Sequence, residues 1–112
     1  MEDAFLRARG VVEEGYRKAF GRQANPSEVD SITRWCMQAR MEDDLIQEIL
    51  NHAALHNAKS PAAYIRHMTM ICQYGYMRTA ADYAQDRAYR DLGDEELARE
   101  ALAERRMRYA DP

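Results

Sequence analysis

The sequence predicts an all-α protein, and three observations lead to that prediction. Its 112 residues include only five glycines and three prolines, while 46% of them are hydrophobic. No stretch alternates apolar and polar residues in the Val-, Ile- and Thr-rich blocks that are typical of strands. Apolar residues instead recur at steps of three and four, as on one face of an amphipathic helix. We therefore expect a compact bundle of about four helices, followed by a helical C-terminal tail.

The first two helices have clear ends. The first covers about residues 3–20, and Gly21 suits the left-handed position that often follows a helix. The second begins at Asn25 and Pro26, an N-cap residue followed by a proline at the first helical position. Its apolar stripe predicts that it continues to about Met41.

Two more helices complete the predicted bundle. The third begins within residues 42–44, whose three carboxylates suit the positive N-terminal end of a helix, and continues towards His56. The fourth begins at Ser60 and Pro61, which repeat the cap and the proline. Gly75 is expected to break or bend it, because glycine disfavours a helix interior.

The last third of the chain is compatible with helices but is only weakly amphipathic. Gly93 and Asp94 interrupt it before a final helix over about residues 95–109, which carries few apolar side chains. We therefore expect two units. A helical domain covers residues 1–75, and a helical tail over residues 76–112 packs on that domain or on a partner.

Charge and cysteine content narrow the class of protein. The chain has 19 acidic and 16 basic residues, a net charge of −3, which excludes a strongly basic histone-type protein but leaves room for a local basic patch. Cys36 and Cys72 lie among apolar neighbours, which favours reduced core thiols over a single disulfide. The charged N-terminus is unlike a signal peptide, and no apolar run is long enough to span a membrane. We expect a soluble, cytoplasmic protein without membrane contact.

Signals for chemistry are weak. Glu48, His52 and His56 share one helix face and could hold a metal, but no HExxH motif and no evident fourth ligand accompany them. Asp43 and Asp44 are explained by the helix dipole alone. Neither a glycine-rich phosphate loop nor a nucleophile motif is present. We expect no enzymatic activity, no cofactor and no metal.

Aromatic and basic residues are interleaved between Tyr64 and Arg90. Residues 57–90 hold five basic and two acidic residues, whereas residues 91–104 hold six acidic residues and one basic residue. Arginines beside rings that can stack on bases are typical of non-specific nucleic-acid binding. Alternatively, the tyrosines pack the fourth helix and the arginines form a solvated face. The candidate nucleic-acid-binding residues are Arg66, Tyr74, Tyr76, Arg78, Arg87 and Arg90.

Three stretches carry a familiar order of signals: YRKAFGRQANPSEVDSITRW (16–35), MEDDLIQEIL (41–50) and SPAAYIRHM (60–68). That order resembles the C-terminal domain of the DnaD/DnaB-type primosome proteins. The family typically shows a tyrosine before Phe-Gly-Arg, and a YIxxI helix that ends in tryptophan. The residues that carry the family motif are Tyr16, Phe20, Gly21, Arg22, Trp35, Tyr64, Ile65 and Met68. Here Arg66 replaces the family's aspartate, and Cys72 replaces its tryptophan.

The resemblance implies an all-helical module that binds DNA weakly and without sequence preference, and that contacts replication initiation or helicase-loading proteins. It also implies that the basic end after the YIxxI helix makes much of the DNA contact. We expect such a module in a phage or mobile element. Two alternatives stay open, both motivated by the acidic segment over residues 91–104. One is a protein-interaction or homo-oligomerisation module without DNA binding, and the other is an inhibitor that mimics phosphates in a host protein's nucleic-acid site.

Overall fold

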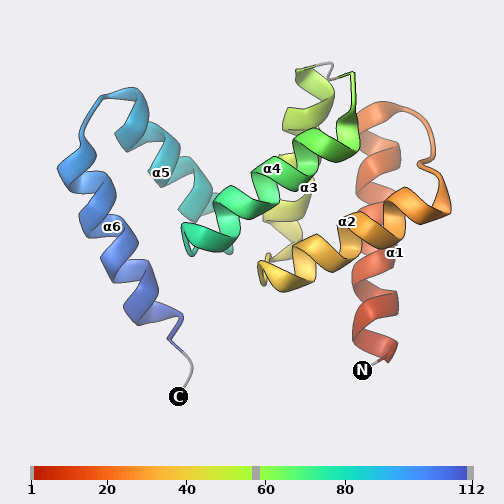
Figure 1. Cartoon of the computed structure of the whole chain (residues 1–112), viewed down its shortest axis with the longest axis horizontal. Coiled ribbons are helices and arrows are strands. Elements are labelled where there is room, and N and C mark those ends of the chain that lie inside the picture. The colour runs from red at the N-terminus through yellow and green to blue at the C-terminus, as the bar shows by residue number, and fades with distance from the viewer. Residues whose placement is uncertain (1, 57–58, 111–112) are drawn as a thin grey trace.

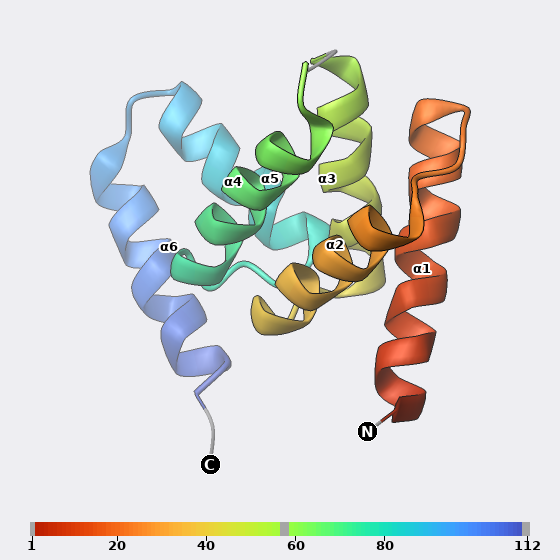
Figure 2. The same ribbon diagram turned by 45° about the vertical axis from the view of Figure 1, so that its right-hand side comes forward.

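A computed structural model describes residues 2–56 and 59–110, and it confirms the all-α prediction: these residues form six helices and no strand (Figure 1). The helices are α1 (Glu2–Phe20), α2 (Pro26–Gln38), α3 (Asp43–Leu55), α4 (Pro61–Tyr74), α5 (Ala80–Asp91) and α6 (Glu95–Arg108). α2 packs on α1 and α4, and α3 packs on α1, α4 and α5. α5 and α6 form a helical hairpin beside the other four helices, as both views show (Figures 1 and 2).

The helix ends follow local sequence chemistry. The side chains of Asn25 and Ser60 accept hydrogen bonds from the backbone N–H groups three residues later, so both predicted N-caps are present. Gly21 ends α1 in the left-handed conformation, with a φ of 72°. A capping box that sequence reasoning missed begins α5, where the side chains of Thr79 and Asp82 each accept a backbone N–H from the other.

The core lies among the first four helices and continues into the next segment. It is built from the apolar stripes predicted for α1 to α4, and Met77 and Tyr83 join the same cluster. Gly75 is required because a Cβ atom there would lie 2.9 Å from the carbonyl oxygen of Ile71. Whether residues 1–75 fold as a separate domain stays a prediction.

Both cysteines are free and buried in this core. Burial raises the pKa of the Cys36 and Cys72 thiols to about 12 from an ordinary 9.0, so about a thousandfold less thiolate is present at neutral pH. We expect the folded protein to react with a thiol reagent such as DTNB at least a hundredfold more slowly than the urea-unfolded chain. Rapid reaction of both thiols in the native protein would contradict this packing.

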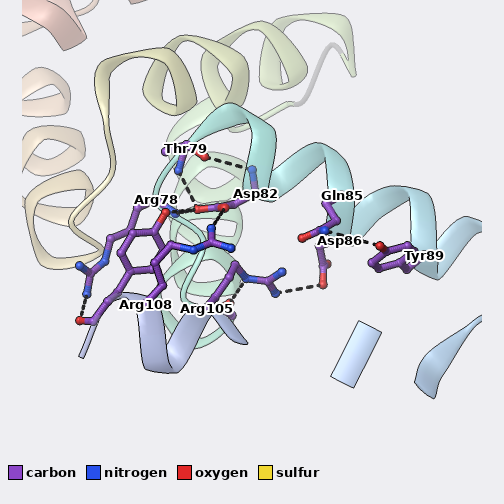
Figure 3. Close-up of polar contacts among 10 residues, drawn as sticks. Arg78, Thr79, Asp82, Gln85, Asp86, Tyr89, Arg105 and Arg108 are labelled. Carbon is purple, nitrogen blue, oxygen red and sulfur yellow. Dashed lines mark hydrogen bonds and ion pairs between the residues drawn. The ribbon is translucent and has the colours of Figure 1, made fainter. Parts of the chain in front are cut away.

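α6 is held to α5 largely by small and polar side chains. Its buried residues are Ala98, Ala101 and Arg105. Opposite them, Asp82 and Asp86 of α5 are buried one helical turn apart and face α6 (Figure 3). The hairpin therefore depends on polar pairing more than on an apolar stripe. No helix in the described part of the chain is both long and apolar enough to cross a membrane.

Candidate nucleic-acid interface

α2 and α4 end in the same way, and the two ends lie at one place on the surface. After each helix a non-glycine residue takes the left-handed conformation: Arg40 with a φ of 53° and Tyr76 with a φ of 55°. In each case the next N–H reaches back to a carbonyl five residues earlier, from Met41 to Cys36 and from Met77 to Cys72. α2 therefore ends three residues before the predicted Met41. Non-glycine residues in the left-handed conformation, such as Arg40 and Tyr76, are strained, and strained residues cluster at functional sites.

The two helix ends and the end of α6 enclose a hollow of about 410 Å³. We call it the arginine hollow. Its lining residues are Gln38, Ala39, Arg40, Gln73, Tyr76, Arg78, Arg106, Tyr109 and Ala110. Three of these are arginines, two are tyrosines and none is acidic, so the hollow is positively charged.

Arginine and tyrosine side chains pair within the hollow. The guanidinium carbon of Arg106 lies 5.3 Å from the ring centre of Tyr76, and that of Arg78 lies 4.4 Å from the ring centre of Tyr109. These distances are typical of cation–π contacts. Arg78 also donates from Nη2 to the carbonyl oxygen of Tyr109 at 3.4 Å, and its own carbonyl accepts the N–H of Glu42 at 2.7 Å. Arg78 and Arg106 are thus held in position by rings and carbonyl groups, and no acidic residue is among the residues that line the hollow.

Asp82 is not among the residues that line the hollow, but it holds two of them, Arg78 and Tyr109, in place. Its Oδ2 accepts hydrogen bonds from Tyr109 Oη at 2.6 Å and from the N–H groups of Arg78 and Thr79 at 3.1 and 3.3 Å. Its Oδ1 lies 3.2 Å from Arg108 Nη1 (Figure 3). Burial alone would raise the pKa of Asp82, but these hydrogen bonds outweigh it and hold the pKa below the ordinary 3.8. The carboxylate is therefore ionised at neutral pH and fixes both Arg78 and Tyr109.

The resemblance noted in the sequence includes a tyrosine before Phe-Gly-Arg, and these residues form one cluster. The rings of Tyr16 and Phe20 stack with their centres 4.3 Å apart, and the guanidinium carbon of Arg22 lies 5.4 and 5.7 Å from those centres. Gly21 permits the turn that brings Arg22 back over the rings. The motif therefore fixes the connection between α1 and α2.

Residues 14–67 match a family model described as replication initiation and membrane attachment. These residues form a DnaD/DnaB-type domain. The resemblance inferred from the sequence is confirmed over this range. No curated protein and no solved structure matches the chain.

The DnaD/DnaB-type domain places its remaining motif residues on α2 and α4. Ile65 and Met68 are buried in the core, and Cys72, which stands at the family's tryptophan position, is fully buried as well. The ring of Tyr64 lies 5.2 Å from that of His56. Trp35 is half-buried beneath the guanidinium of Arg66, at 5.3 Å. These residues pack the helices of the domain together.

The arginine hollow lies largely beyond the matched range. Only the lining residues at the end of α2 and just after it, including Arg40, belong to residues 14–67. Tyr76 and Arg78 follow α4, Arg106 lies in the last turn of α6, and Tyr109 follows α6. Arg40, Arg106 and Tyr109 were missed by sequence reasoning. The three arginines over residues 105–108 were visible in the sequence, but nothing in it indicated that Arg106 lies beside Tyr76.

The other candidate residues lie elsewhere. Tyr74, Arg87 and Arg90 border a second hollow between α4, α5 and α6, and Arg66 covers Trp35. Nη1 of Arg87 lies 2.9 Å from His52 Nε2, and Arg90 pairs with Asp86. The six candidates therefore divide among three surfaces, and only Tyr76 and Arg78 share the arginine hollow.

The possible metal ligands in and just after α3 do not converge on one point. Glu48 Oε1 lies 3.1 Å from His52 Nε2, whereas the rings of His52 and His56 are 6.4 Å apart and His56 packs on Tyr64. Within residues 2–56 and 59–110, no three His, Cys, Asp or Glu side chains are grouped as they would be to hold a metal ion. Tertiary packing accounts for these histidines.

Proposed function

We propose that the chain is a DnaD-like DNA-binding module of a replication initiation or helicase-loading system. In this proposal it binds single- or double-stranded DNA weakly and without sequence preference, and it contacts partner proteins. The first four helices act as the DnaD-like domain, and α5 and α6 act as a tail that completes the binding surface. The module acts by binding alone and catalyses no reaction.

The observation that carries this proposal is the arginine hollow. Guanidinium groups suit phosphate oxygens, because their planar donors can bond two oxygens at once. The rings of Tyr76 and Tyr109 lie beside these cations, and Tyr76, which is 37% exposed, has a ring that can stack on an unpaired base. Contacts to phosphates and to the faces of bases do not distinguish one sequence from another, which is why we expect non-specific binding.

A net charge of −3 limits the strength of binding. Outside the hollow, α6 presents the acidic side chains Glu95, Glu96, Glu100 and Glu104, and these repel phosphates at low salt. We propose that this acidic surface confines DNA to the hollow. Arg66, Tyr74, Arg87 and Arg90 stay predicted DNA contacts that the arrangement of the hollow does not require.

A salt titration tests the proposal. Fluorescence anisotropy with a labelled 20-nucleotide single strand and the matching duplex, at 20 and 150 mM salt, measures both affinity and its salt dependence. We expect binding in the micromolar range at low salt, with little change when the sequence is scrambled. The logarithm of the affinity should fall with the logarithm of the salt concentration, with a slope of about −0.7 to −0.9 per phosphate contacted. Absence of binding at 20 mM salt would refute the proposal.

The second candidate function is a protein-interaction or homo-oligomerisation module, and exposed apolar side chains of the tail favour it. Leu92 and Met107 are 80% and 82% exposed. Light scattering on the wild type and on Leu92→Ser plus Met107→Ser distinguishes the two functions. A concentration-dependent dimer that the double variant abolishes, together with no DNA binding, would support this alternative.

A further inference from the structure

A second hollow separates the C-terminal half of α4 from the α5–α6 hairpin. It has a volume of about 520 Å³, within the range of pockets that hold small ligands or short peptide segments. Apolar side chains from three helices and one loop form most of its surface, among them Ile71, Met77, Tyr83 and Leu102. We call it the apolar groove. None of the DnaD/DnaB motif residues except Met68 lines it.

Arg105 is the most unusual residue of the apolar groove. Only 1% of it is exposed. Its Nε donates to the carbonyl oxygen of Gly75 at 3.1 Å, but neither Nη1 nor Nη2 has a hydrogen-bond partner among the described residues. A buried charged donor without a partner costs free energy, and a guanidinium is satisfied best by a carboxylate that accepts from both Nη atoms.

The acid within the groove does not satisfy Arg105. Asp86 Oδ1 lies 3.6 Å from Arg105 Nη2, which is ion-pair distance but too long for a hydrogen bond. The other oxygen of Asp86 already accepts from Arg90 Nε at 2.8 Å. With Arg87 also in the lining, three cations face one carboxylate. The groove therefore combines an apolar surface with unbalanced positive charge.

We propose that the apolar groove binds a short segment of a partner protein in which a carboxylate side chain stands among apolar ones. The apolar side chains cover Ile71 and Leu102, and the carboxylate accepts hydrogen bonds from Arg105. A peptide fits this surface better than DNA does, because most of the lining is apolar and Asp86 would repel phosphates. This peptide binding rests on the partner contacts of the proposed function and does not depend on DNA binding.

Ile71 and Met70 provide a matched pair of variants for the test. They are neighbours on α4 with nearly equal exposure, 39% and 38%, but only Ile71 lines the groove. Ile71→Glu places a carboxylate where the apolar part of the peptide would lie. Met70→Glu adds the same charge to the same helix outside the groove. Both positions are exposed enough for the chain to fold, which circular dichroism checks.

The probe is an array of hexapeptides that combine one or two Asp or Glu residues with Leu, Ile, Met or Phe at the other positions. A second array replaces Asp by Asn and Glu by Gln. We expect acidic members to bind with dissociation constants below 1 mM, and their amide counterparts at least tenfold more weakly. Ile71→Glu should weaken binding at least tenfold, whereas Met70→Glu should change it less than twofold.

Three results would overturn the proposal: no acidic member binds below 1 mM, the amide peptides bind equally well, or Ile71→Glu binds like the wild type. Anionic vesicles and single-stranded DNA are tested in parallel, and binding of either that Ile71→Glu alone abolishes would assign the groove to that ligand instead. A loss of peptide binding in the apolar groove can be distinguished from a loss of DNA binding in the arginine hollow. Ile71→Glu should lower DNA affinity much less than Arg78→Ala plus Arg106→Ala does, and Arg106→Ala should leave peptide affinity unchanged.

Discussion

Asp82→Ala is expected to lower the free energy of unfolding by about 3 kcal/mol. The substitution removes the acceptor for Tyr109 Oη and for the N–H groups of Arg78 and Thr79. Each buried donor left without a partner costs about 1–3 kcal/mol, although some regain water when the structure relaxes. Urea denaturation measures the change, and amide hydrogen exchange should show that α6 loses protection first.

Asp91→Ala is the matched control for Asp82→Ala, because Asp91 is an exposed acid on the same helix. It should change stability by less than about 0.5 kcal/mol. Since the folded state lowers the pKa of Asp82, its contribution is present above the ordinary 3.8 and is lost as the pH falls through the lowered value. Asp82→Asn should therefore reduce the acid dependence of stability. An unchanged acid profile would contradict the role given to this carboxylate.

The double substitution Arg78→Ala plus Arg106→Ala is expected to weaken DNA binding at least tenfold at low salt. Both guanidiniums line the arginine hollow, and no acidic side chain shares that lining. If each contacts one phosphate, the slope of log affinity against log salt becomes less negative by about 1.4–1.8. Anisotropy titrations at several salt concentrations measure both quantities.

Two further variants distinguish a loss of DNA contacts from a loss of folding or of net positive charge. Arg106→Ala alone removes an exposed side chain that makes no ion pair with an acid among the described residues, and it should weaken binding by an intermediate amount. Arg99→Ala removes the same charge from the same helix outside the hollow and should change affinity less than twofold. Equal losses for Arg99→Ala and Arg106→Ala would mean that net charge, and not the hollow, determines binding.

Much of the fold is predictable from local patterns, because caps and apolar stripes act over a few residues. Asn25, Ser60 and Gly21 end or begin helices where expected, and the stripe residues of the first four helices form the core. The end of α2 was less predictable. Its left-handed residue is Arg40, an arginine and not a glycine. Tertiary context compensates for this local strain.

The candidate site was only half predictable. Tyr76 and Arg78 stand out as an aromatic beside a base, but the hollow also needs Arg40 and Arg106, which are far away in the chain. Three separate segments meet there because α6 folds back along α5. Asp82 and Asp86 were a signal for that packing. They are two acidic residues one helical turn apart in a basic stretch, and in the structure they pair with arginines of the last helix.

The most direct measurement is a map of amide chemical-shift changes in the ¹⁵N-labelled protein as a single-stranded dT₁₂ oligonucleotide is added at low salt. DNA binding through the arginine hollow predicts that the largest changes fall on Arg40, Tyr76, Arg78, Arg106 and Tyr109, and that they vanish as salt is raised. If no residue shifts, or if the largest changes fall on α1 and leave these five unaffected, the central claim is wrong.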